Sequence, residues 1–492
     1  MAHIASRSPS DPAGRQFLPW LAGLGGAVLV AATAATAPGA TLLAGLGSLI
    51  VVGLFLTPKP AVAIVGAFLV LQPLLVNLAG GVQNSLGGAL HRVHEVAAVA
   101  AGVRVLIFLA WRPLAVRLRP WVALVGVFLS AGLVSAMLQQ VPIFTALLGA
   151  FLAIKIPLFF LMALTVDWHP RDARWMVRGL LILGLGLLAT GVLWLILPPD
   201  AMQLFNEPGA GAEDFFARGG LRSMQAPFAH PGTFGWAMSL IGCYAIAHQV
   251  TRPGLVGSST LVASVMGIVG SLRRKPLVAF PVAALVGGLT VGSRRHRWAI
   301  VGLLVVLIAG TLGFGMTRLR TAASDAVTGY LDPYAPTTAR ALLYATGWRI
   351  GVDRFPLGAG FGRFGGYASE LDYSPVYDDY GLSGIWGLSR AFPNYIEDTY
   401  WPHILGETGF VGLSAMLVLL FGLWLRALRA ARRSGDQDLR VLALGASMAL
   451  IEALVESIVS PGFEVSLPAF ALAVPLGMVV VLDAPGTSER LE

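Results

Sequence analysis

Residues 180–197, LLILGLGLLATGVLWLIL, contain no charged side chain and are followed directly by Pro198. A helix of this length and composition approaches the ~20 apolar residues that cross a ~30 Å hydrocarbon layer. Similar stretches recur along the chain, and 56% of its 492 residues are apolar while 12% are charged, about half the charged share of a typical soluble domain. Helices satisfy their own backbone hydrogen bonds in lipid, and no β-barrel alternation is present. The sequence therefore predicts an all-α polytopic membrane protein.

The apolar stretches predict about 14 transmembrane helices. The expected spans are residues 17–37, 39–56, 60–78, 94–111, 120–138, 143–165, 176–197, 230–248, 255–271, 275–292, 298–316, 402–425, 440–459 and 464–483. Lys and Arg concentrate in every second connector, beginning with the N-terminus, which indicates that these connectors and both termini are cytoplasmic. The net charge of +8 is therefore explained by topology and not by nucleic-acid binding.

The predicted organisation has a large loop on the extracytoplasmic side. The parts are a cytoplasmic N-terminus (1–16), the first helices with an outer loop at 198–229 (17–316), the large extracytoplasmic loop (317–401), the last helices (402–483) and a cytoplasmic tail (484–492). In the large loop, Thr337 or Thr338 is a candidate helix cap. The apolar residues that follow, at helical spacing, are Ala341, Leu342, Ala345, Trp348 and Val352. We expect a helix that lies on or near the outer membrane surface.

Basic residues also occur on the predicted outer side, where the charge bias disfavours them. They lie in connectors that are distant in sequence, namely Arg218 and Arg222, then Arg273, Arg274 and Lys275, then Arg340. Guanidinium groups bind phosphate oxygens in pairs, so we expect these cations to converge on an anionic lipid head group or a diphosphate. The alternative is that they reach interfacial lipid phosphates and balance the acids of the large loop.

Carboxyl groups and histidines occur at the same predicted surface. Glu397 and Asp398 precede one span, His403 lies at the start of that span, and His230 opens another. Burial or a neighbouring arginine shifts the proton affinity of a carboxylate, which suits a general base. The alternative for an acid in this place is a helix cap. The spacing of His and acidic residues does not indicate a metal site.

Four segments resemble, in the same order, motifs of the O-antigen ligase and polymerase superfamily of bacterial membrane glycosyltransferases. They are RSMQAPFAHPGTFGWAM (222–238), GSLRRKPLVA (270–279), GWRIGVDRFPLGAGFGRF (347–364) and EDTYWPHILGETGFVGL (397–413). Two departures are visible, because Glu397 and Asp398 stand where the ligases commonly carry His-Asn, and Gly232 stands where asparagine is usual. The acidic pair is more similar to the polymerase branch.

The resemblance implies a metal-independent enzyme of the bacterial inner membrane that needs no cofactor and builds a cell-envelope polysaccharide. Its donor would be a glycan on a polyprenyl diphosphate, such as undecaprenyl diphosphate, and its acceptor a sugar hydroxyl on the outer face. Residues that would bind the diphosphate are Arg222, Arg273, Arg274, Lys275, Arg340 and Arg218. Asp398 or Glu397 would activate the hydroxyl, with His230 and His403 in reserve. Ligase-type transfer to another acceptor, and a transporter or flippase of lipid-linked oligosaccharide, are the alternatives.

Overall fold

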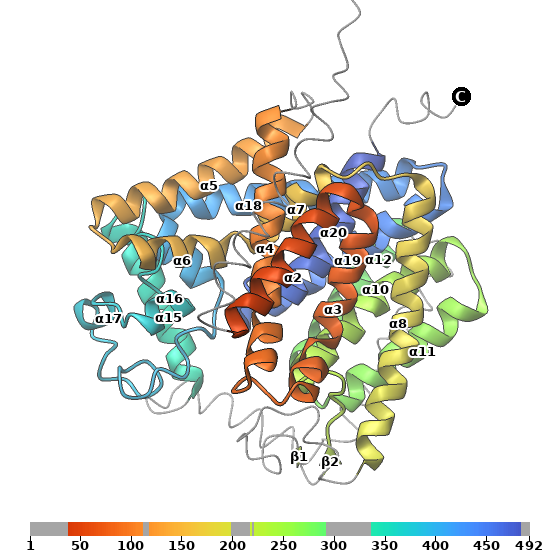
Figure 1. Cartoon of the computed structure of the whole chain (residues 1–492), viewed down its shortest axis with the longest axis horizontal. Coiled ribbons are helices and arrows are strands. Elements are labelled where there is room, and N and C mark those ends of the chain that lie inside the picture. Colours follow the sequence, from red (N-terminus) through yellow and green to blue (C-terminus); the bar gives the residue numbers. More distant parts are fainter. Residues whose placement is uncertain (1–37, 112–117, 198–216, 219–220, 292–335, 484–492) are drawn as a thin grey trace, which may run out of the picture. The chain divides into compact units, whose positions relative to one another are not determined.

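The computed structural model describes residues 38–111, 118–197, 217–218, 221–291 and 336–483 (Figure 1). The predicted spans at 17–37 and 298–316, and both predicted cytoplasmic termini, lie outside these residues. Every other predicted span contains a helix, so the prediction of helices is confirmed there. The chain divides into two units, Met1–Trp111 and Arg112–Glu492.

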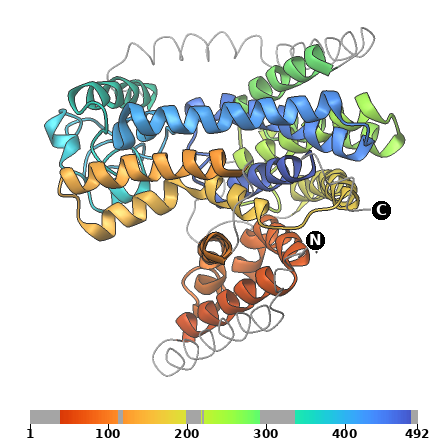
Figure 2. The ribbon, with the colours of Figure 1, turned by 90° about the horizontal axis from the view of Figure 1, so that it is seen from above.

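The first unit contains α2 (Pro38–Leu56), α3 (Pro58–Leu78) and α4 (Ser85–Trp111), which pack against one another (Figure 2). Pro58 occupies the first turn of α3, where its missing amide hydrogen costs no helical bond. The buried Arg104 of α4 donates a hydrogen bond to the Leu54 carbonyl and lies over the Phe55 ring. The end of α2 leaves such carbonyls without a helical partner. Arg104 therefore has a structural role inside this unit.

The second unit is a larger bundle of helices. They are α5 (Arg119–Leu138), α6 (Ile143–Ala153), α7 (Lys155–Leu164), α8 (Pro170–Ile196), α10 (Pro231–Thr251), α11 (Leu255–Gly270), α12 (Arg274–Val291), α15 (Pro336–Asp353), α16 (Tyr367–Leu371), α17 (Val376–Asp379), α18 (Trp401–Arg433), α19 (Gln437–Glu456), the 3-10 turn η2 (Ser457–Val459) and α20 (Ser466–Leu482). A two-residue strand β1 (Ala217–Arg218) pairs antiparallel with β2 (Leu221–Arg222). The long helix α18 packs beside α5 and α19 (Figure 2).

Six of the described helices are long and apolar enough to cross a membrane. They are α3, α4, α5, α8, α18 and α19 with its 3-10 extension. The pair α6 and α7 is bent by 60° and adds a seventh span if the two helices cross as one. The described part of the chain is therefore that of an all-α, multi-pass membrane protein, and the total of about 14 helices stays a prediction.

The connectors of the second unit gather at the two ends of its bundle. At one end, Arg174 at the start of α8 lies 2.7 Å from Asp438 at the start of α19, and Arg252 after α10 lies 3.7 Å from the same carboxylate. These three residues belong to connectors that the charge bias assigns to the cytoplasm. At the other end, the Met224 amide donates to the Gly270 carbonyl, which joins two predicted outer connectors. These contacts join connectors of the same predicted side, and the sidedness itself stays a prediction.

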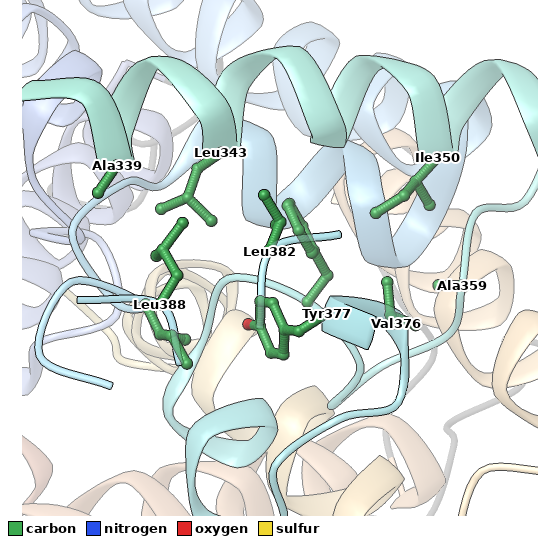
Figure 3. Close-up of a cluster of buried hydrophobic side chains, with 10 residues drawn as sticks. Ala339, Leu343, Ile350, Ala359, Val376, Tyr377, Leu382 and Leu388 are labelled. Atoms are coloured by element: carbon green, nitrogen blue, oxygen red, sulfur yellow. The ribbon is translucent and has the colours of Figure 1, made fainter. Parts of the chain in front are cut away.

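Helix α15 covers a small core made by the large loop (Figure 3). Ala339, Leu343 and Ile350 point from the helix toward loop residues that include Tyr377 and Leu382. The buried face is not the predicted apolar stripe, since four of the five stripe residues are exposed (Ala341, Ala345, Trp348 and Val352) and Leu342 is partly buried. The helix is confirmed, most of its apolar stripe is exposed, and its place at the membrane surface stays a prediction.

The turn after α15 docks against a break in α18. Gly409 has φ 63° and ψ −164°, which interrupts the helix and frees the carbonyls of Gly406 and Glu407 from their usual partners four residues on. The amides of Ala359 and Gly360 donate to these two carbonyls at 2.7 and 2.9 Å. A Cβ on Gly409 would lie 2.2 Å from the Pro356 carbonyl oxygen, so only glycine fits. The glycine-rich turn thereby fixes the large loop to the membrane helices.

Candidate functional site

Five charged side chains, here called the mixed-charge cluster, meet at the end of the bundle that carries the predicted outer connectors. They are Arg273 and Lys275 at the start of α12, Arg340 of α15, Asp398 of the large loop and Glu456 at the end of α19. Arg340 donates to Asp398 across 2.7 Å. The charges of Arg340, Glu456, Asp398 and Arg273 all act on the ammonium group of Lys275. Arg273 and Lys275 from one predicted outer connector and Arg340 from another therefore lie near one another, and their binding of an anion stays a prediction.

The turn between α11 and α12 explains why these cations sit where they do. Ser271 ends α11, and its hydroxyl accepts a hydrogen bond from the Arg273 amide at 3.3 Å. Leu272 adopts a left-handed conformation with φ 52°, which reverses the chain. Pro276 then falls in the first turn of α12, where no helical partner is required of its nitrogen. The sharp turn holds Arg273 and Lys275, both partly buried, at the same end of the bundle.

Other predicted cations lie elsewhere or point outward. Arg222 donates to the Leu197 carbonyl at 3.1 Å, so it closes the end of α8. Arg274, the first residue of α12, is exposed. Arg218 lies in β1, and its side chain is outside the described part of the structure. Of the predicted cations whose side chains the structure describes, only Arg273, Lys275 and Arg340 belong to the mixed-charge cluster.

The predicted reserve base His230 is a helix cap. Its Nδ1 atom accepts a hydrogen bond from the Gly232 amide at 2.9 Å, at the start of α10. The residue is exposed. This local contact accounts for a histidine before Pro231, since the first amides of a helix lack helical acceptors.

His403, the other reserve, belongs to a buried group here called the Glu–His–Glu triad. Its Nδ1 lies 2.5 Å from Glu464, and its Nε2 lies 2.9 Å from Glu407. The second oxygen of Glu407 accepts a hydrogen bond from the Phe364 amide at 2.9 Å. Both ring nitrogens of His403 thus face carboxylates, Nδ1 through a hydrogen bond to Glu464 and Nε2 through an ion-pair contact with Glu407.

The two carboxylates of the triad lie on opposite edges of one imidazole ring, which does not bring them together around one ion. Among the described residues, no group of three or more His, Cys, Asp or Glu side chains is arranged to hold a metal. Glycine lets the loop approach the ring, because a Cβ on Gly366 would lie 2.7 Å from the His403 ring. The triad is therefore a close-packed junction between the loop and the helices.

Glu397 and Asp398, adjacent in sequence, have different surroundings. Asp398 is paired with Arg340, as described above. Burial, a contact with Glu370 and the charge of Glu464 together raise the pKa of Glu397 to about 8, against the lowering effect of His403. Neither acid caps α18, whose cap residue is Tyr400 without a side-chain hydrogen bond. The capping alternative therefore does not explain this pair.

Sequence reasoning missed Glu464, which neighbours the candidate acids in space and not in sequence. The residue lies in the short connector between η2 and α20, in the stretch SPGFEVSLP (460–468). A single acid in an otherwise uncharged connector between two apolar spans is the signal that could have singled it out. Its partner His403 could not be inferred from spacing, because 61 residues separate them.

Comparison with known proteins adds no family to this description. No model of a known protein family matches the chain, and no curated protein matches it. The fold and the site define a multi-pass helical membrane protein with buried acids and a mixed-charge cluster at one end.

Proposed function

We propose that the protein is a membrane glycosyltransferase of the polysaccharide polymerase type. It takes a glycan from a polyprenyl diphosphate and transfers it to a hydroxyl of an acceptor sugar on the outer face of the bacterial inner membrane. The observation that carries the proposal is the contact of Arg340 with Asp398 beside Lys275 and Arg273. This contact brings cations from separate connectors together with a pair of acids. The transfer requires both kinds of group.

Arg340 has one hydrogen-bond donor left for an anionic ligand. The Nε atom of Arg340 is buried and has no hydrogen-bond partner among the described residues. A buried donor without a partner is costly, and a phosphate oxygen would satisfy it. As the bond between the sugar and the diphosphate breaks, negative charge grows on the leaving group. Cations already aimed there stabilise the transition state more than the ground state.

Glu397 is the better general base of the two acids. The Asp398 carboxylate is already occupied by its ion pair with Arg340. Glu397 has a pKa of about 8 because it is partly buried beside other carboxyl groups. A base is most effective when its pKa lies near the working pH. Glu397 takes the proton of the acceptor hydroxyl as that oxygen attacks the anomeric carbon, and polyprenyl diphosphate departs.

The reaction is tested with the full chain purified in detergent. It is supplied with a polyprenyl-diphosphate-linked oligosaccharide, and products are followed by mass spectrometry. We expect longer glycans and free polyprenyl diphosphate. A donor that remains intact would contradict the enzyme and favour the transporter alternative, because a detergent micelle has no two sides for transport. Transfer only to an added unrelated acceptor would favour the ligase alternative.

The proposed sidedness predicts which positions a membrane-impermeant maleimide reaches. The one cysteine of the chain, Cys243, is buried, which leaves a low background. Arg274→Cys, at an exposed position beside the cluster, should be labelled in intact spheroplasts. Gly435→Cys, exposed at the other end of the bundle, is the matched control and should be labelled only after permeabilisation. The reverse pattern would contradict both the outer site and the cytoplasmic termini.

A further inference from the structure

We infer that Glu464 is a positioning residue, which holds the stretch carrying Glu397 and Asp398 in place through the Glu–His–Glu triad. The role of Glu464 in catalysis rests on the proposed function, whereas the contacts described below do not depend on it. Three segments distant in sequence meet at the His403 ring. They are the turn at Phe364–Gly366, the start of α18 and the connector before α20. His403 and Glu407 are each 1% exposed and Glu464 is 9% exposed.

The triad favours one relative position of these three segments. A buried ionisable group is tolerated only when it is paired and hydrogen-bonded. His403 contacts both carboxylates, and Glu407 also accepts from the Phe364 amide. Removing Glu464 leaves the Nδ1 side of His403 without its carboxylate. A shifted loop would also separate Glu407 from its amide partner, so the three segments are ordered together.

The same connector holds the residues directly after Asp398. The Tyr400 ring packs edge-on against the Phe463 ring, with centroids 4.9 Å apart. The Trp401 indole N–H donates to the Ser457 hydroxyl at 3.0 Å. With the His403–Glu464 contact, Tyr400, Trp401 and His403 are joined at three nearby positions to η2 and to the connector that follows it. The backbone of Glu397 and Asp398 therefore depends on where the connector lies.

Glu464 also acts on Glu397 by charge. The groups that act on Glu397 come from three elements, namely Glu370 of α16, His403 of α18 and Glu464 of the connector. Glu397 is also next to Asp398, whose charge is paired with Arg340. In Glu464→Gln, Glu407 remains beside the His403 ring. The net change is then the loss of one negative charge near Glu397, which lowers its pKa.

The first experiment compares Glu464→Gln with Val465→Ala, an exposed neighbour in the same connector. Hydrogen exchange of residues 396–401 is measured by mass spectrometry on the full chain in detergent. We expect exchange at least tenfold faster in Glu464→Gln and unchanged in Val465→Ala. If Glu464→Gln does not fold, Glu464→Asp, which keeps the charge and shortens the side chain, takes its place. Exchange in the Glu464 variant as slow as in the wild-type protein would overturn the positioning role.

The second readout is the pH profile of glycan transfer. The acid limb of kcat should move to lower pH in Glu464→Gln and stay in place in Val465→Ala. An unmoved limb with an unchanged kcat would overturn the inference. If the unchanged protein makes no glycan, the proposed function fails, but the exchange measurement still decides whether Glu464 positions the loop.

Discussion

Replacement of Arg340 by alanine is expected to lower the rate of glycan transfer by about 10²–10³-fold, the usual loss when one donor to a developing negative charge is removed. Arg340 reaches from α15 to Asp398 at 2.7 Å and shares its surroundings with Lys275. Its Nε has no hydrogen-bond partner among the described residues, and the proposed function gives it a phosphate oxygen as acceptor. Turnover of a lipid-diphosphate oligosaccharide by the purified variant measures the effect.

Arg222→Ala is the matched control for this prediction. Arg222 is also an arginine of a predicted outer connector, but it donates to the Leu197 carbonyl at the end of α8. We expect less than a tenfold loss of rate, since its removal leaves the cluster intact. Arg340→Lys tests charge apart from geometry, because an ammonium group keeps the charge but cannot bind two phosphate oxygens in parallel as a guanidinium does. Equal rates for Arg340→Ala and Arg222→Ala, both in folded protein, would contradict the assignment of the diphosphate site.

The positions of the helices follow from sequence because they depend on local pattern. Apolar runs of membrane length predict α3 and α5 closely, since the solvent is the main constraint on such segments, while α8 begins six residues before its predicted span. The helix α15 was predicted from a cap and a periodic stripe, but its buried face was not. The stripe records where the apolar residues are, whereas burial depends on which face the loop residues cover. That choice is made by contacts distant in sequence.

The candidate site was predictable only in part for the same reason. The excess of cations on the predicted outer side drew attention to Arg273, Lys275 and Arg340, because topology disfavours charge there. The same excess included Arg222, whose real acceptor is a carbonyl at a helix end that no charge pattern reveals. Glu464 was overlooked because its importance comes from His403. Pairing of this kind depends on the packing of two connectors, which one sequence does not specify.

Glu397→Gln is expected to lower kcat by about 10²–10⁴-fold, the usual contribution of a general base. Asp398→Asn should lower it by about tenfold or less, because Asp398 orients Arg340 and takes no proton. The two substitutions remove the same kind of group from adjacent positions, so each is a control for the other. Equal, mild effects would contradict the choice of Glu397 as base.

The pH dependence gives this prediction its sharpest form. Burial raises the pKa of Glu397 to about 8, well above the usual value of 4.5, so its basic form accumulates as the pH rises toward 8. The rate of the unchanged protein should therefore rise through this range and level off above it, whereas Glu397→Gln should show a flat profile. Between the two pKa values the folded chain binds a proton that the unfolded chain has lost, so stability falls as the pH rises and is level above 8. Glu397→Gln should remove this part of the stability loss in thermal melts, and an unchanged pH dependence of both rate and melting temperature would show that Glu397 ionises normally.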